Sequence, residues 1–193
     1  MSSKRAEAAV IIHTNAVVSS SLAFLTSQAV PVNVGLTTVS IGFLTFSLIK
    51  LLRPEIEDVE RVAAGITGTI AGAVATGFVA KSIVGIIPVI GNFTSAAVNF
   101  GMIETLGWGL FTLLSERPTV EGITAAEFKE YMKKGEKQKV DVQEVIVSLP
   151  VEVKSKYDAL MAQMKDKGLS NEDKARIQSE IATLIAPYMP EEL

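Results

Sequence analysis

Glu104 and Lys81 are the residues best placed to do chemistry, because each is a lone charge in an uncharged stretch. Between residues 62 and 115 the chain contains no other acidic or basic side chain. An ionisable group inside an apolar helix is costly, and in a membrane it often marks an ion or proton pathway. The alternative is that Glu104 is paired, hydrogen-bonded or protonated and has a structural role. Lys81 ends its apolar helix, and we expect it to reach a polar interface.

The remaining candidates for chemistry are few. His13 is the only histidine and there is no cysteine, which excludes disulfides, thiol nucleophiles and thiolate or multi-histidine metal sites. His13 could carry protons, although a hydrogen-bonded packing histidine is the simpler interpretation. The glycines around residues 65–68 lack the Gly-Lys-Ser/Thr ending of a phosphate loop. We therefore expect no enzymatic activity, no cofactor and no metal.

Residues 61–115 are the stretch that must position these charges. Two long Gly/Ala/Thr-rich helical segments flank the sequence Ile-Pro-Val-Ile-Gly-Asn at residues 87–92. Pro88 lacks a backbone N–H and stops a helix, Gly91 accepts left-handed backbone angles, and Asn92 can cap a new helix. The pattern predicts a tight helical hairpin.

Small residues recur at every fourth position on both arms of this hairpin, so that they share one helix face. Glycines in an exposed helix cost about 1 kcal/mol each relative to alanine, so a close packing partner is expected. Such faces pack helices in lipid, and we expect them to mediate self-association. The glycines assigned to this packing are Gly65, Gly68, Gly72, Gly77, Gly101 and Gly109.

Charge divides the chain into two parts. The 193 residues have a formal net charge of -3, which argues against a nucleic-acid partner. Residues 8–49 contain no charged side chain, whereas residues 116–193 carry many charges of both signs. We expect an apolar helical module over residues 1–115 and a charged helical tail over residues 116–193.

Four apolar helices are predicted in the first part, near residues 5–28, 36–52, 61–86 and 93–115. Pro31 and Gly35 suggest a turn between the first two, so the fold class is all-α with two helical hairpins. If the four helices cross a bilayer, all basic residues near their ends fall on one side. The positive-inside rule then places both termini in the cytoplasm. The alternative is a cytoplasmic oligomer in which protein covers the apolar faces.

The tail contains the signals of further amphipathic helices. Thr124 is placed to cap a helix over residues 125–134, with Gly135 expected to end it. Ser170, with Asp173 three positions on, resembles a capping box. The apolar stripes over residues 153–164 and 177–188 have matching spacing, which predicts that these two helices pack together.

The order of these features resembles the YcjF-type family of helical domains of unknown function, which accompany Era-like and dynamin-like GTPases. The resemblance covers about residues 6–114 and rests on Ala29-Val30-Pro31-Val32, Ala80-Lys81, the turn at residues 86–92 and Glu104-Thr105-Leu106-Gly107-Trp108. It implies a membrane-associated helical module that works with a GTPase, and no catalytic residues. The chain departs from that pattern in its charged tail and in having no GTPase domain.

Three hypotheses on function follow. The first is a membrane-associated module in contact with lipid that self-associates through small-residue faces and presents its tail to a partner such as a GTPase. The second is a structural protein that assembles into a large homo-oligomer through its apolar hairpins. The third is a small pore or transporter that uses Glu104.

Overall fold

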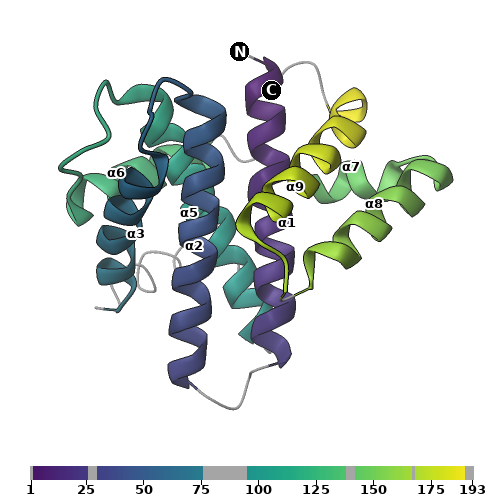
Figure 1. Cartoon of the computed structure of the whole chain (residues 1–193), viewed down its shortest axis with the longest axis horizontal. Coiled ribbons are helices and arrows are strands. Elements are labelled where there is room, and N and C mark those ends of the chain that lie inside the picture. Colours follow the sequence, from purple (N-terminus) through teal and green to yellow (C-terminus); the bar gives the residue numbers. More distant parts are fainter. Residues whose placement is uncertain (1, 26–29, 76–94, 138–141, 167, 190–193) are drawn as a thin grey trace.

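The computed structural model describes residues 2–25, 30–75, 95–137, 142–166 and 168–189, which form helices joined by short connections (Figure 1). The all-α prediction is confirmed for these residues. The α-helices are α1 (Ser2–Leu25), α2 (Val30–Leu52), α3 (Val59–Ala75), α5 (Ser95–Glu116), α6 (Ala125–Glu136), α7 (Val142–Ser148), α8 (Val151–Met164) and α9 (Asn171–Ile185), and a short 3-10 helix, η1 (Ala186–Tyr188), follows them.

Helices α1, α2 and α5 form the centre of the molecule. Figure 1 shows α3 and α6 on one side of this centre and α7, α8 and α9 on the other. Helix α5 packs against both α1 and α6, and α9 packs against α1 and α8. Within the described part of the chain, the buried hydrophobic residues form one cluster that includes side chains from the apolar helices and from the tail.

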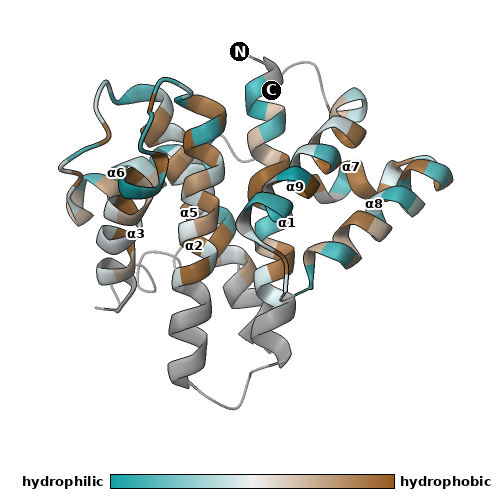
Figure 2. Cartoon of the chain, viewed as in Figure 1, coloured by the Kyte–Doolittle hydropathy of each residue, from teal (hydrophilic) through white to brown (hydrophobic). Residues whose placement is uncertain are grey.

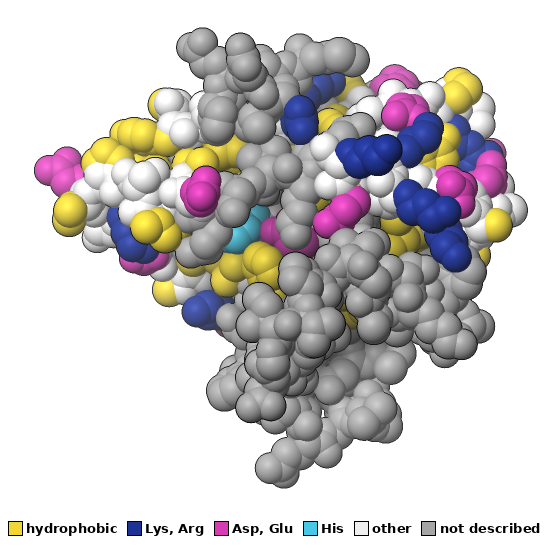
Figure 3. Space-filling view, turned by 180° about the vertical axis from the view of Figure 1, so that it is seen from behind, with side chains coloured by type: hydrophobic (Ala, Val, Ile, Leu, Met, Phe, Trp, Pro, Cys, Tyr) yellow, Lys and Arg dark blue, Asp and Glu magenta, His cyan; other side chains and the backbone are white. Residues whose placement is uncertain are grey.

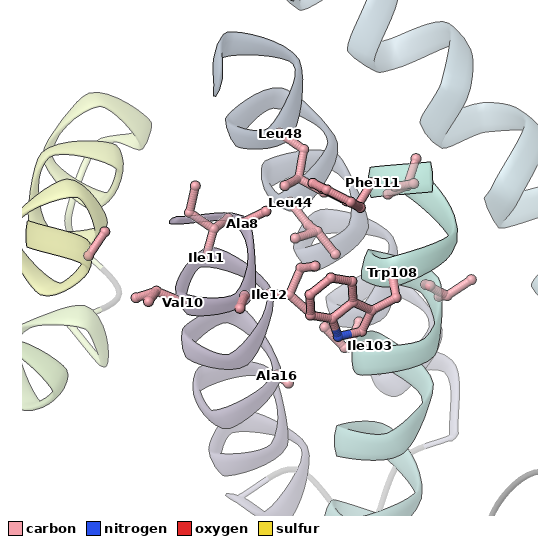
Figure 4. Packing of buried hydrophobic residues seen from close by; sticks show 14 of the residues in the cluster. Ala8, Val10, Ile11, Ile12, Ala16, Leu44, Leu48, Ile103, Trp108 and Phe111 are labelled. Atoms are coloured by element: carbon pink, nitrogen blue, oxygen red, sulfur yellow. The ribbon is translucent and has the colours of Figure 1, made fainter. Parts of the chain in front are cut away.

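Trp108 of α5 lies in the middle of this cluster with no exposed surface (Figure 4). Its ring meets the edge of Phe111, with 5.5 Å between the ring centroids. Ile12 of α1 and Leu44 of α2 are equally buried and lie near the indole. Ile41, Leu44 and Leu48 of α2 are fully buried, and they share one face because they are three or four positions apart.

Three buried hydroxyl groups of the central helices, those of Ser20, Thr45 and Thr112, are satisfied within their own helix. Ser20 donates to the carbonyl of Ala16 at 2.6 Å, and Thr45 donates to the carbonyl of Ile41 at 2.7 Å. Thr112 repeats the arrangement on α5. A hydroxyl bonded to the carbonyl four residues earlier needs no partner from another helix. These helices therefore bury Ser and Thr at little cost.

The predicted membrane spans are wrong for the helices that the structure describes. None of them combines the length and the apolarity needed to cross a bilayer. This finding overturns the four-span topology with both termini cytoplasmic, the membrane-associated module and the pore that would use Glu104. The physical reason is that helices of the same chain cover apolar faces that were assigned to lipid, since α9 packs on α1 and α6 packs on α5.

Two boundaries also differ from the sequence interpretation. Helix α2 begins at Val30, so Pro31 lies in its first turn rather than in a loop. Proline is tolerated there because the first N–H groups of a helix have no intrahelical acceptor. Gly135 was expected to end α6, but the helix continues to Glu136 and Gly135 is buried. The hairpin turn at Pro88, Gly91 and Asn92 lies outside the described residues, as do Lys81 and Gly77.

The tail helices are amphipathic. Figure 2 shows hydrophilic and hydrophobic residues mixed along α6, α8 and α9, and the buried residues of α6 include Phe128 and Met132. Tyr157 and Met161 of α8 are buried, as are Ile177 and Ile181 of α9, and the predicted packing of these two helices is confirmed. The division into domains at residue 115 stays a prediction.

The capping box at Thr124 leads to a prediction about stability. The Glu127 N–H donates to Thr124 Oγ1 at 3.2 Å, and the Glu127 carboxylate accepts from the Thr124 N–H at 3.0 Å. Thr124→Ala removes the first bond, so the free energy of unfolding should fall by about 1 kcal/mol. Urea titration of both proteins measures this. Thr183→Ala, which changes an exposed threonine in the last turn of α9, is the control, and an equal loss there would contradict the cap as the cause.

Candidate functional site

Glu104 and His13, the two ionisable candidates of the central helices, form a buried pair. His13 Nδ1 on α1 lies 3.0 Å from Glu104 Oε1 on α5, although 91 positions separate them in the chain. The side chains are only 5% and 4% exposed. The edge of Phe100 packs against the imidazole, with 5.4 Å between ring centroids. A structural role therefore explains both positions, with Glu104 hydrogen-bonded and His13 a packing histidine.

A histidine whose Nδ1 contacts a carboxylate is also the arrangement found in catalytic histidine bases. Whether His13 could act as such a base depends on the surroundings of its other ring nitrogen, Nε2. His13 Nε2 is buried and has no hydrogen-bond partner among the described residues. A nucleophile in contact with the base is the diagnostic feature of covalent catalysis. The described pair lacks this contact, and its clear role is to link α1 to α5.

The packing glycines divide into two groups. Gly109 of α5 faces α6 so closely that a Cβ atom there would lie 2.8 Å from Met132 Cγ, and Gly101 is half-buried on the same helix. Gly65, Gly68 and Gly72 of α3 are exposed, and none of the described atoms lies within 4 Å of a Cβ placed there. Their role in self-association stays a prediction.

A groove with a volume of about 1010 Å³ runs between α2 and α3, and we call it the α2–α3 groove. Its α2 wall contains Thr38, Gly42, Phe46 and Lys50, which follow one another at intervals of four residues. Its complete lining is Thr38, Gly42, Phe43, Phe46, Lys50, Glu57, Asp58, Val59, Glu60, Ala63, Ala64, Thr67, Gly68, Ser170 and Glu172. The groove thus begins beside the exposed glycine face of α3 and reaches the start of α9.

The lining of the groove combines small, aromatic and acidic residues. Thr67 is 8% exposed, and its hydroxyl has no hydrogen-bond partner within the part of the chain that is described. Phe46 is half-buried, and the Lys50 ammonium lies 4.6 Å from the centre of its ring. A buried hydroxyl without a partner is uncommon in native proteins.

Carboxylates dominate the charge of the groove. Four acidic side chains and one lysine line it, and all five are exposed. Asp58 accepts a hydrogen bond from Arg61 Nε at 2.9 Å, which raises the pKa of the Arg61 guanidinium above its usual value. Glu57, Glu60 and Glu172 make no ion pair with any described residue. Lys50 and the Arg61 that pairs with Asp58 offset part of this charge, and the groove keeps an excess of negative charge.

The surface of α6, in contrast to the acidic groove, carries charges of both signs in pairs. Seen from behind in Figure 3, basic and acidic side chains gather together on the side where α6 lies. Lys133 pairs with Glu130 at 2.9 Å, and Lys134 pairs with Glu116 at 2.6 Å. The charges of that surface are balanced, and the surface does not select the sign of a ligand.

The α2–α3 groove was missed by the interpretation of the sequence. The signal available was the acidic run at residues 55–60 directly before a helix with small residues on one face. Such a run has a sufficient local explanation, because carboxylates are favourable at the positive end of a helix dipole. The contribution of Ser170 and Glu172 depends on a contact more than 100 positions away along the chain.

Comparison of the chain with family models, with curated proteins and with solved structures finds no match. The resemblance to YcjF-type domains, and the GTPase partner that it implies, therefore stay predictions.

Proposed function

We propose that this protein is an interaction module whose α2–α3 groove receives an amphipathic helix from a basic partner protein. The observation that carries the proposal is the groove itself, which is lined both by small residues and by the exposed carboxylates of Glu57, Glu60 and Glu172. A binding groove of this kind uses the apolar edge of the incoming helix for contact area and its flanks for selection.

The length of the groove suits a helix. The α2 wall extends from Thr38 to Lys50, which corresponds to roughly 18 Å along a helix axis. Three turns of a docked helix cover this distance, so residues at positions i, i+4 and i+7 of the partner can face the floor. A compact small molecule would leave most of the groove unfilled.

The width of the groove is set by small side chains. Gly42 of α2 and Ala63, Ala64 and Gly68 of α3 line it, and Gly68 has open space where a side chain would be. Helix axes approach most closely where the contacting residues are small. Partly exposed Phe43 and Phe46 provide the aromatic surface that is enriched at protein interfaces.

The charge of the groove selects the partner. Lysine and arginine on the flanks of a docked helix would meet the carboxylates of Glu57, Glu60 and Glu172. A second copy of this chain docked by a two-fold axis would instead bring equal acidic rims together, and like charges are unfavourable. A heterologous basic helix therefore fits the groove better than self-docking does.

This proposal predicts selective binding of a defined peptide. The probe is a 14-residue amphipathic helix, about as long as the α2 wall of the groove. It carries alanine and leucine on one edge and lysine on both flanks. We expect the full chain to bind it in fluorescence anisotropy, and the triple charge reversal Glu57→Lys, Glu60→Lys and Glu172→Lys to weaken binding by about tenfold or more. The reversed residues are exposed, so the fold should be retained.

Two controls accompany this measurement. Glu130→Lys reverses a carboxylate on α6, away from the groove, and should leave binding unchanged. A peptide with glutamate in place of lysine should not bind. Equal binding of the two peptides would refute the proposal, and so would a sedimentation result in which groove variants dissociate a dimer of the chain.

A further inference from the structure

We propose that a second hollow, between α1, α2 and α9, binds a small zwitterion such as a free α-amino acid. The hollow has a volume of about 510 Å³, within the range of small-molecule sites. Glu7, Ile11, Ser47, Lys50, Leu51, Gln178, Ser179, Ala182, Thr183, Ala186 and Pro187 line it. We call it the α9 hollow. This inference does not depend on the proposed function of the α2–α3 groove.

The side-chain amide of Gln178 is the main evidence for a ligand. It is 1% exposed, and its Oε1 accepts a hydrogen bond from Ser47 Oγ at 3.2 Å. Its Nε2 group has no partner among the residues the structure describes. A buried amide N–H without an acceptor costs free energy, so such groups are normally paired with protein, water or ligand. An oxygen of a ligand in the hollow would satisfy it.

Two opposite charges at the hollow add to this requirement. Glu7 is on α1 and Lys50 is in the last turn of α2, and both line the hollow. Within the described ranges neither forms an ion pair, although the Lys50 ammonium lies over the Phe46 ring. A carboxylate and an ammonium on two different walls complement a ligand that carries one charge of each sign.

The remaining walls are suited to an apolar side chain. Ile11 of α1 and Ala182 of α9 are at most 9% exposed, and Leu51 of α2 is half-buried. A free amino acid has all the matching parts: a carboxylate for Lys50 and the Gln178 N–H, an ammonium for Glu7, and an aliphatic group for these walls. A few fixed polar groups in a mostly apolar hollow are typical of small-ligand sites.

The test is isothermal titration calorimetry of the full chain with three related probes. L-leucine carries both charges, leucinamide lacks the carboxylate, and N-acetyl-leucine lacks the ammonium. We expect leucine to bind, and each of the other two to bind at least about tenfold more weakly. A leucyl dipeptide serves as a fourth probe, which distinguishes a site for the free amino acid from a site for a peptide end.

Variants assign the binding to the α9 hollow. Gln178→Glu keeps the shape of the side chain and replaces the N–H donor by oxygen, and Glu7→Gln removes the partner of the ammonium. Each should weaken leucine binding about tenfold or more. Glu130→Gln on α6 is the control and should leave it unchanged. Neither Glu7 nor Gln178 lines the α2–α3 groove, so peptide binding there should persist in both variants.

Three outcomes would overturn the inference. The first is no heat of binding with leucine at concentrations up to about 10 mM. The second is equal affinity for leucine and for both neutralised probes. The third is leucine binding that Gln178→Glu and Glu7→Gln leave intact while circular dichroism shows both variants to be folded.

Discussion

Gly135→Ala should destabilise the protein by about 3 kcal/mol, although alanine is the better helix former. A Cβ atom at position 135 would lie 2.4 Å from the carbonyl carbon and oxygen of Trp108 and 2.6 Å from the backbone nitrogen of Gly109. These are backbone atoms of α5, which cannot rotate away as the end of a side chain can. Helices α5 and α6 would have to move apart. Chemical denaturation of the two proteins measures the difference.

Gly72→Ala is the matched control for this prediction. Gly72 lies in α3, and none of the described atoms is within 4 Å of a Cβ at that position. The same change of residue should therefore stabilise the chain by up to about 1 kcal/mol through helix propensity. If Gly135→Ala is as stable as Gly72→Ala, the close contact of α5 and α6 is not as described. Sedimentation of Gly72→Ala also tests the predicted self-association through this face.

Glu104→Ala should lower the free energy of unfolding by about 3 to 5 kcal/mol. The substitution leaves His13, which is 4% exposed, without its hydrogen-bond partner and opens a space beside α1. Glu104→Gln keeps an oxygen that can accept from the imidazole and should cost about 1 kcal/mol. Thermal and urea unfolding at neutral pH compare the three proteins.

A double substitution distinguishes the free energy of the His13–Glu104 interaction from the cost of leaving one of the two side chains buried without its partner. In His13→Leu with Glu104→Leu both polar groups are absent, so no buried group is left unpaired and stability should recover by about 2 kcal/mol relative to Glu104→Ala. The coupling free energy from the complete double-mutant cycle measures the interaction itself. A coupling near zero would show that the two side chains do not depend on each other.

Local features of the fold were predictable from the sequence, whereas the neighbours of the apolar helices were not. The caps at Thr124 and Ser170 depend on residues three positions away, so their sequence patterns contain all that is needed. The sequence of an uncharged helix does not indicate whether lipid or protein covers its apolar face. Lipid and amphipathic tail helices both satisfy such a face, and this is why α1 and α5 were assigned to a membrane.

The candidate sites show the same limit. Glu104 was singled out correctly as an unusual charge, but its partner His13 is on another helix and nothing in its sequence neighbourhood indicates the pairing. Gly109 was chosen as a packing glycine, and it does allow a close contact, but with Met132 of the tail. Gly135, which makes the closest approach, was assigned to a helix end because glycine is common there.

The distance along the chain between His13 and Glu104 has a consequence for synthesis. Helix α1 is made first, yet its partner on α5 is 91 positions later. At about 5 to 20 residues per second the ribosome needs roughly 5 to 20 s to supply that partner. During this interval the apolar side chains of α1 have no α5 to pack against. Helices α5 and α6 are consecutive, so α1 waits longer for α5 than α5 waits for α6.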